Sequence, residues 1–126
     1  MKKVLILEDE GMLANLFRSQ FHGEPIELVI AATAAAARKL FKREEFDVVV
    51  LDGIAPSEPG CHASLVGPTL AKEFRSAGYN GPLIASSSDP QAVDLMLKAG
   101  CSHSCEKLRL QELLRELLLL SHVPQP

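Results

Sequence analysis

The chain has 126 residues, a hydrophobic fraction of 47% and a formal net charge of −3. This length fits one domain, residues 1–126, and the apolar content is sufficient for a hydrophobic core. The mild negative charge excludes the dense Lys/Arg field of a nucleic-acid-binding surface, and no apolar run is long enough to span a bilayer.

Strands and helices alternate along the first half of the chain. They comprise a strand at Val4–Leu7, a helix over about residues 10–22, a strand at Glu27–Ala31, a helix capped by Thr33 and running through Phe41, and a strand at Asp47–Asp52. The last of these is the clearest, because it is continuously apolar between two acids, as a central parallel strand should be.

The second half begins with a predicted long loop, residues 53–66, which is rich in Gly, Pro and Ser. The elements expected after it are a helix from Gly67-Pro68 to near Gly78, a strand at Pro82–Ala85, a helix opened by Asp89-Pro90 and ended by Gly100, a strand at about 101–106, and a helix at Leu110–Leu120. The tail, residues 122–126, is expected to be frayed.

Five strand–helix units in strict alternation predict an α/β fold, with an open parallel sheet and helices on both faces. In such sheets ligands bind at the carboxyl ends of the strands. Polar side chains fall at those ends: Glu8 and Asp9 after the first strand, Asp52 after the third, Ser87 after the fourth and Lys107 after the fifth.

Three carboxylates gathered at one edge repel one another, and a bound cation relieves that repulsion. Ligands that are all oxygen suit Mg²⁺, or Mn²⁺ in its place. A nearby ammonium and hydroxyl would hold the oxygens of a phosphoryl group. Positioning and charge neutralisation of this kind are what phosphoryl transfer needs.

These motifs resemble those of response regulator receiver domains, the phosphoacceptor modules of two-component signal transduction. The resemblance is carried by Leu7-Glu8-Asp9-Glu10, by Asp47-Val48-Val49-Val50-Leu51-Asp52, by Pro82-Leu83-Ile84-Ala85-Ser86-Ser87, and by Ala99-Gly100 followed seven residues later by Lys107. It covers the whole chain in the right order. It implies a flavodoxin-like (βα)5 sheet with strand order 2-1-3-4-5, in a single-domain receiver.

The resemblance also implies residue roles. Asp52 would accept the phosphoryl group from a histidine kinase or a histidine phosphotransfer protein, while Ser87 and Lys107 would contact phosphoryl oxygens. The metal ligands would be Asp9, Asp52 and the Ile54 carbonyl, with Glu8 acting largely through water. Ser86 and Ser88 leave the choice of switch hydroxyl open by one residue.

Four features depart from the family pattern. The segment from Asp52 to Gly67 is about seven residues longer than usual, which suits either a partner-recognition element or a tolerated insertion. Ser104 replaces the usual aromatic residue, which puts the standard output switch in doubt. Leu108 replaces the usual proline, so we expect a trans peptide there. Ser88 is bulkier than the usual Ala or Gly.

The expected function is a cytoplasmic phosphorylation switch, not an enzyme, that signals to a downstream protein and binds neither nucleic acid nor membrane. No residues remain after Pro126 for an output domain within this sequence. One alternative is a pseudo-receiver, an interaction module that phosphate does not regulate. A small hydrolase with Asp52 as nucleophile ranks last, because no general acid is evident.

Two further sets of residues allow more than one interpretation. Cys61, His62, Cys101, His103 and Cys105 match no common zinc spacing, and Cys101 and Cys105 are expected to pack beside the fifth strand as thiols. The leucines of the last helix predict either a deeply packed stripe or a homodimer face. The stripe comprises Leu110, Leu113, Leu114, Leu117 and Leu118, and Leu119 and Leu120 widen it.

Overall fold

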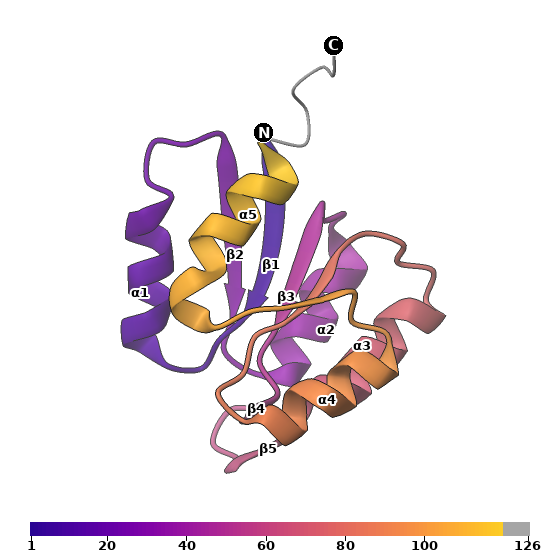
Figure 1. Ribbon diagram of the computed structural model, residues 1–126. Helices are drawn as coiled ribbons and strands as arrows, with labels where there is room; N and C mark the ends of the chain where they lie inside the picture. Colours follow the sequence, from indigo (N-terminus) through magenta and orange to yellow (C-terminus); the bar gives the residue numbers. More distant parts are fainter. Residues whose placement is uncertain (120–126) are drawn as a thin grey trace.

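Five parallel strands form one sheet in the order β2-β1-β3-β6-β7 in the computed structural model, which describes residues 1–119 (Figure 1). The strands are β1 (Lys2–Leu7), β2 (Ile26–Ala31), β3 (Val48–Leu51), β6 (Leu83–Ala85) and β7 (His103–Ser104). Counted within the sheet, this order is 2-1-3-4-5, so the predicted doubly wound topology is confirmed. The tail expected to be frayed, residues 122–126, and Leu120 lie outside the described residues.

Helices cover both faces of the sheet. They are α1 (Gly11–Gln20), α2 (Ala34–Arg43), α3 (Gly67–Ser76), α4 (Pro90–Ala99) and α5 (Leu110–Leu118). Helices α1 and α5 pack on one face, and α2, α3 and α4 pack on the other (Figure 1). The sheet therefore separates two hydrophobic clusters, one on each side.

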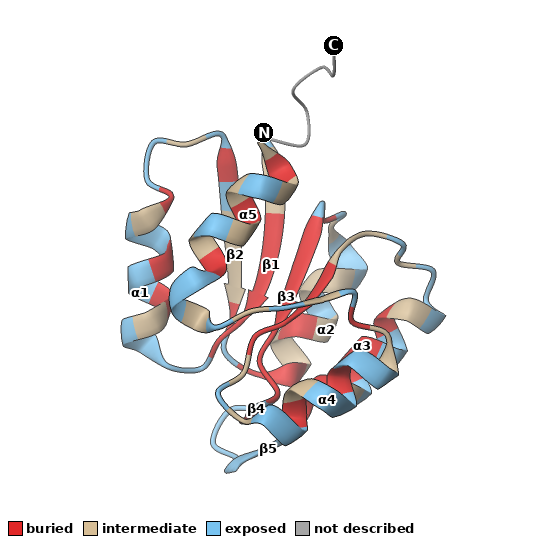
Figure 2. Ribbon diagram, viewed as in Figure 1, coloured by how far each residue is buried: buried red, intermediate tan, exposed pale blue. Residues whose placement is uncertain are grey.

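Strand β3 shows why a central strand is apolar throughout. Val48 and Val50 point into the cluster under α1 and α5, whereas Val49 and Leu51 point into the other. All four residues are buried (Figure 2). Because side chains alternate between faces and both faces are covered, no position in β3 tolerates a polar residue.

Side-chain caps fix the starts of two helices where the sequence predicted them. The Thr33 hydroxyl accepts a hydrogen bond from the Ala36 amide at 3.1 Å, and the Asp89 carboxylate accepts one from the Gln91 amide at 2.9 Å. Each cap satisfies one amide that the first turn leaves unpaired. Helix α4 ends at Gly100, whose φ of 129° favours glycine.

Two predicted segments differ from the structure. The expected loop 53–66 contains an antiparallel hairpin of two short strands, β4 (Ile54–Pro56) and β5 (Ala63–Leu65). The expected strand at 101–106 is reduced to the two residues of β7, followed by a 3₁₀ turn, η1 (Lys107–Arg109). The polar sequence of this region leaves it little apolar surface to bury, so it pairs with the sheet only briefly.

The last helix packs its leucine stripe against the sheet. Leu110, Leu114 and Leu118 are buried, while Leu113 and Leu117 are half-buried beside them. The predicted core-facing stripe is confirmed, and a homodimer face on the last helix stays a prediction. Within residues 1–119, no helix combines the length and apolar character that crossing a membrane requires.

Arg75 of α3 joins the ends of several elements. Its guanidinium donates to the carbonyls of Tyr79 and Gly81 at 2.9 and 2.7 Å, and to that of Gly100 at 2.8 Å. These carbonyls lie after α3, before β6 and after α4 respectively. A single side chain therefore ties the carboxyl ends of α3 and α4 to the start of β6.

Candidate functional site

The candidate site lies at the carboxyl edge of the sheet. Glu8 follows β1, Asp52 follows β3 and Lys107 begins η1 just beyond β7. Since parallel strands end at the same edge, these three side chains meet although up to 99 positions of sequence separate them. The edge lies where the arrowheads of β1 and β2 end in Figure 1, near the β4–β5 hairpin.

Lys107 bridges two buried carboxylates. Its Nζ lies 2.8 Å from Asp52 Oδ2 and 2.9 Å from Glu8 Oε1. The side chains of Glu8 and Asp52 are only 2% and 7% exposed, and that of Lys107 is 19% exposed. Ion pairs with so little solvent are strongly coupled, and each partner depends on the others for its charge.

A third carboxylate, that of exposed Asp9, completes the cluster. One oxygen from each of Glu8, Asp9 and Asp52 lies within 4.8 Å of the others. Three carboxylates face one ammonium, so acidic groups are in excess at the site. The excess charge and the all-oxygen donor set fit a divalent cation of the Mg²⁺ type.

Burial and neighbouring charges shift the pKa values of the ionisable groups in opposite directions. Burial raises the pKa of Glu8 above its usual 4.5, and the hydrogen bond from Lys107 only partly opposes this. Burial alone would lower the pKa of Lys107, but its bonds to Asp52 and Glu8 outweigh that effect and raise it. The ammonium is therefore secured as a cation, whereas the charged form of Glu8 is disfavoured.

Backbone amides hold the remaining carboxylate oxygens. The Ile54 amide donates to Asp52 Oδ1 at 3.3 Å, and the Glu10 amide donates to Glu8 Oε2 at 3.1 Å. Ile54 is therefore at the site, as the sequence predicted, and its amide makes the contact. A metal bond from its carbonyl stays a prediction.

Two serines compete for the role of site hydroxyl. Ser87, the predicted residue, lies beside the segment that follows Asp52, since a Cβ added to Gly53 would be 3.1 Å from its Oγ. That Oγ already accepts a hydrogen bond from the Asp89 amide at 3.3 Å.

Ser86 is the more available hydroxyl. It is 3% exposed, and within the described residues its Oγ has no hydrogen-bond partner. The register pairs Leu51 with Ala85, so Ser86 follows β6 at the level where Asp52 follows β3. A buried hydroxyl without a partner is costly, which makes Ser86 a second candidate for the site hydroxyl. The run of three serines leaves the choice between these hydroxyls open in the sequence.

Three of the residues that depart from the family pattern line a cavity of about 650 Å³ between α4 and the β7–η1 segment. Ser104, Ser88 and Leu108 are all exposed in its lining, together with Ser87 and Lys107. The small side chain of Ser104 leaves this space open. The Lys107–Leu108 peptide is trans, as predicted.

The cysteines of the fifth unit pack as predicted. Cys101 is buried and Cys105 is half-buried, and burial raises the pKa of Cys101 to about 11. Cys61 is exposed on the β4–β5 hairpin. At about pH 7 the buried thiol is therefore neutral and unreactive.

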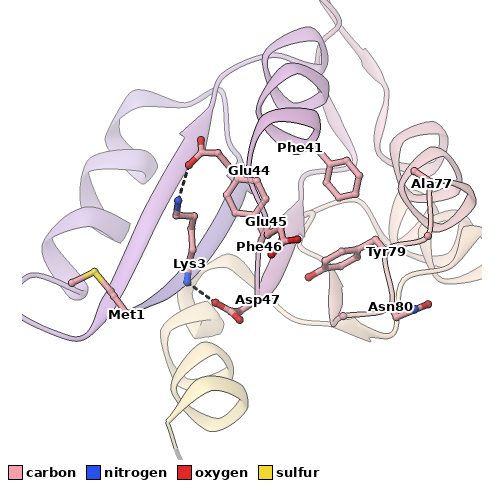
Figure 3. A pocket seen from close by; sticks show the side chains of 12 residues that line it. Met1, Lys3, Phe41, Glu44, Glu45, Phe46, Asp47, Ala77, Tyr79 and Asn80 are labelled. Atoms are coloured by element: carbon pink, nitrogen blue, oxygen red, sulfur yellow. Dashed lines mark hydrogen bonds and ion pairs between the residues drawn. The ribbon is translucent and has the colours of Figure 1, made fainter.

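A second cavity, of about 740 Å³, lies at the opposite edge of the sheet (Figure 3). Lys3, Glu44, Asp47 and Tyr79 line it. The Lys3 ammonium is 2.7 Å from Glu44 Oε1, and the Lys3 amide donates to Asp47 at 2.8 Å. None of the predicted site residues lies in this cavity.

Comparison with solved structures relates this fold to one group of proteins. The response regulator TrrA of Thermotoga maritima, solved with Mg²⁺ and beryllium fluoride, is 26% identical, with a TM-score of 0.74 over 94% of this chain and 100% of that one. A Francisella response regulator receiver domain is 24% identical, with a TM-score of 0.74 over 95% and 96%. The beryllium fluoride-activated receiver domain of Klebsiella pneumoniae RstA is 22% identical, with a TM-score of 0.73 over 93% and 99%. No protein-family model and no curated protein sequence matches the chain.

A doubly wound sheet with an acidic cluster at its carboxyl edge defines a flavodoxin-like α/β domain. The match over almost the whole of both chains narrows this class: the chain has the response regulator receiver fold of two-component signal transduction. Receiver domains are signalling domains rather than conventional enzymes.

Proposed function

We propose that the chain is a phosphoacceptor receiver domain that takes a phosphoryl group onto Asp52. The observation that carries the proposal is the Lys107 ammonium held between the buried carboxylates of Asp52 and Glu8, with Asp9 close enough to share a cation with both. A solvated cluster without a function would not bury two acids around one base.

Asp52 would act as the nucleophile. One of its carboxylate oxygens attacks the phosphorus of a phosphohistidine on a histidine kinase or phosphotransfer protein, forming an O–P bond as the P–N bond breaks. The electron pair of that bond leaves with the imidazole, which takes up a proton. The product is an acyl phosphate on Asp52, and its later hydrolysis returns the carboxylate and inorganic phosphate.

The other residues would position and neutralise charge. Lys107 is close enough to Asp52 to bind an oxygen of the phosphoryl group attached there. The hydroxyl of Ser86 or Ser87 would donate a hydrogen bond to another phosphoryl oxygen. Asp9, Asp52 and the Ile54 carbonyl would hold a divalent cation, with Glu8 assisting through water. Such a cation, when bound, supplies the positive charge that lets an anionic phosphoryl group approach a carboxylate.

The proposed role implies a cytoplasmic protein, with residues 1–126 acting as one module whose partners are a phosphodonor and a downstream target. The second candidate is a pseudo-receiver that binds a partner independently of phosphate. It is favoured by Ser104, which leaves an open cavity beside Lys107 where an aromatic switch would otherwise sit.

Intact-mass measurement separates the two candidates. The protein is incubated with Mg²⁺ and acetyl phosphate or phosphoramidate and then weighed. We expect a gain of one phosphoryl group, absent in Asp52→Asn and retained in the matched variant Asp47→Asn at the opposite edge. No gain in the wild-type protein under any of these conditions would overturn the proposal and favour the pseudo-receiver.

A further inference from the structure

The β4–β5 hairpin is an ordered element anchored beside the site. Ala55 of β4 is fully buried in the core, and the Ser57 carbonyl accepts a hydrogen bond from the Ala35 amide at the start of α2, at 2.9 Å. Residues 58–65 beyond this anchor are all exposed. The hairpin therefore has a fixed base and a free outer strand.

The pairing register directs the main chain of Ile54 toward the site. Ile54 pairs with Leu65, and the Val66 amide donates to the Gly53 carbonyl at 3.0 Å. In an antiparallel ladder this makes Ile54–Leu65 a non-hydrogen-bonded pair, so the N–H and C=O of Ile54 point away from β5. The N–H reaches Asp52 Oδ1. The first residue of the hairpin is thus bonded to the carboxylate and not to the ladder.

Close packing fixes the chain on the other side of this contact. A Cβ on Gly53 would lie 2.7 Å from Ala92 Cβ of α4, and a Cβ on Gly67 would lie 2.7 Å from the Asp52 carbonyl oxygen. Segments packed without room for a methyl group cannot shift toward α4. A change at the Asp52 carboxylate is therefore transmitted outward, through Ile54.

We propose that the β4–β5 hairpin is a built-in reporter of the state of Asp52, an inference that rests on the proposed function. The free carboxylate shares its negative charge over both oxygens, so the Ile54 N–H has a charged acceptor. In an acyl phosphate the two oxygens become an ester oxygen and a neutral carbonyl, which are weaker acceptors. Phosphorylation therefore loosens the Ile54 contact, whichever oxygen reacts.

Loosening the contact between Ile54 and Asp52 changes the exposed surface of the hairpin. Ile54 and Leu65 are 38% and 48% exposed, and side chains of a non-hydrogen-bonded pair lie close together on one face. A shift of β4 moves both at once. The apolar surface of the hairpin thus changes with the state of Asp52, without an aromatic residue at position 104.

The test uses beryllium fluoride with Mg²⁺ as the phosphoryl mimic on the full chain. Fluorine NMR reports whether the adduct forms, and amide hydrogen exchange is followed at Ala55 and Ser64, which the register pairs across the hairpin. We expect exchange at these amides to become roughly two- to tenfold faster, the equivalent of one weakened hydrogen bond. Amides of the 78–81 turn at the opposite edge should not change.

A variant tests whether the Ile54 N–H transmits the change from Asp52 to the hairpin. Ile54→Pro removes the N–H that reaches Asp52 and leaves the ladder bonds and the Ile54 carbonyl intact. Once fluorine NMR shows that this variant forms the adduct, its hairpin should exchange equally fast with and without the mimic. A bound adduct with unchanged Ala55 and Ser64 exchange in the wild-type protein overturns the reporter alone. A full wild-type response in Ile54→Pro overturns the Ile54 route. Failure of the wild-type protein to form any adduct overturns the proposed function and the reporter with it. If Ile54→Pro does not fold, the wild-type measurement still decides.

Discussion

The two edges of the sheet carry similar groups in different surroundings. At the carboxyl edge Lys107 lies between Asp52 and Glu8, and at the opposite edge Lys3 lies 2.7 Å from Glu44 and 3.7 Å from Glu27. The acids at the carboxyl edge are 2% and 7% exposed, whereas Glu44 and Glu27 are 32% and 49% exposed.

Burial, rather than residue type, distinguishes the candidate site from a surface ion pair. Exposed ion pairs are screened by water and contribute little to stability, so Lys3 and its partners form an ordinary solvent-exposed ion-pair cluster. Buried pairs lose hydration and bind one another strongly, and removal of one partner leaves a charge without compensation. The exposed cavity at the Lys3 edge is the larger of the two described above, yet the proposed chemistry lies at the other edge.

The largest expected effect comes from removing each lysine in turn. Lys107→Met should lower the free energy of unfolding by about 3 kcal/mol, because it leaves the Asp52 and Glu8 carboxylates buried without a cation. Lys3→Met should have a much smaller effect, since water replaces the ammonium. Urea unfolding of both variants at neutral pH measures the difference. Equal losses would contradict the contrast between the edges.

The second test adds a cation. Mg²⁺ at ten times its dissociation constant should raise the free energy of unfolding by about 1.4 kcal/mol, because only the folded chain gathers the three carboxylates. Asp9→Asn should remove most of this gain, while Glu45→Gln, an exposed acid at the opposite edge, should keep it. Thermal unfolding over a Mg²⁺ series gives the values, and a gain that survives in Asp9→Asn would exclude the site.

The third test compares hydroxyls. The Tyr79 hydroxyl donates to the Pro82 carbonyl at 3.3 Å, whereas Ser86 Oγ has no partner in the described chain. Ser86→Ala should slow phosphorylation by acetyl phosphate about tenfold, the equivalent of one charge-assisted hydrogen bond, with no loss of stability. Tyr79→Phe should leave the rate unchanged. If Ser87→Ala is slow and Ser86→Ala is not, Ser87 holds the role instead.

The smallest expected effect is a pH dependence. The folded-state pKa of Glu8 is raised, so the folded chain holds a proton there more readily than the unfolded chain, and stability is lost as the pH rises through that pKa. Glu8→Gln should therefore be more stable than the wild-type protein at neutral pH, and its advantage should shrink as the pH falls. Chemical denaturation across this pH range is the measurement. A constant difference would show that the burial penalty on Glu8 is absent.

Much of the scaffold could be predicted because its signals are local. The uninterrupted apolar run of β3 and the capping residues Thr33 and Asp89 placed strands and helices without any tertiary information. The order of the strands then brought Glu8, Asp52 and Lys107 to one edge, as expected. Periodicity and caps are properties of a few neighbouring residues, and the sequence displays them directly.

The parts that escaped prediction depend on contacts between distant residues. The strands of the β4–β5 hairpin have three residues each, too few for a visible alternation. The direct ion pair between Glu8 and Lys107 joins residues at opposite ends of the chain, and no local pattern in the sequence indicates it. The choice between Ser86 and Ser87 depends on the register of β6 against β3.

Arg75 provides a fixed point about which helices α3 and α4 can rotate. Its hydrogen bonds tie the carboxyl ends of both helices to the start of β6, whereas the amino ends of the same helices lie next to Asp52 and Ser87. The amino end of α3 is joined to the site by the hydrogen bond from the Gly67 amide to the Gly53 carbonyl at 3.0 Å, so a disturbance at the site acts on helices whose other ends Arg75 holds. Motion of these helices should be a tilt about Arg75 rather than a translation, largest where they meet the hairpin.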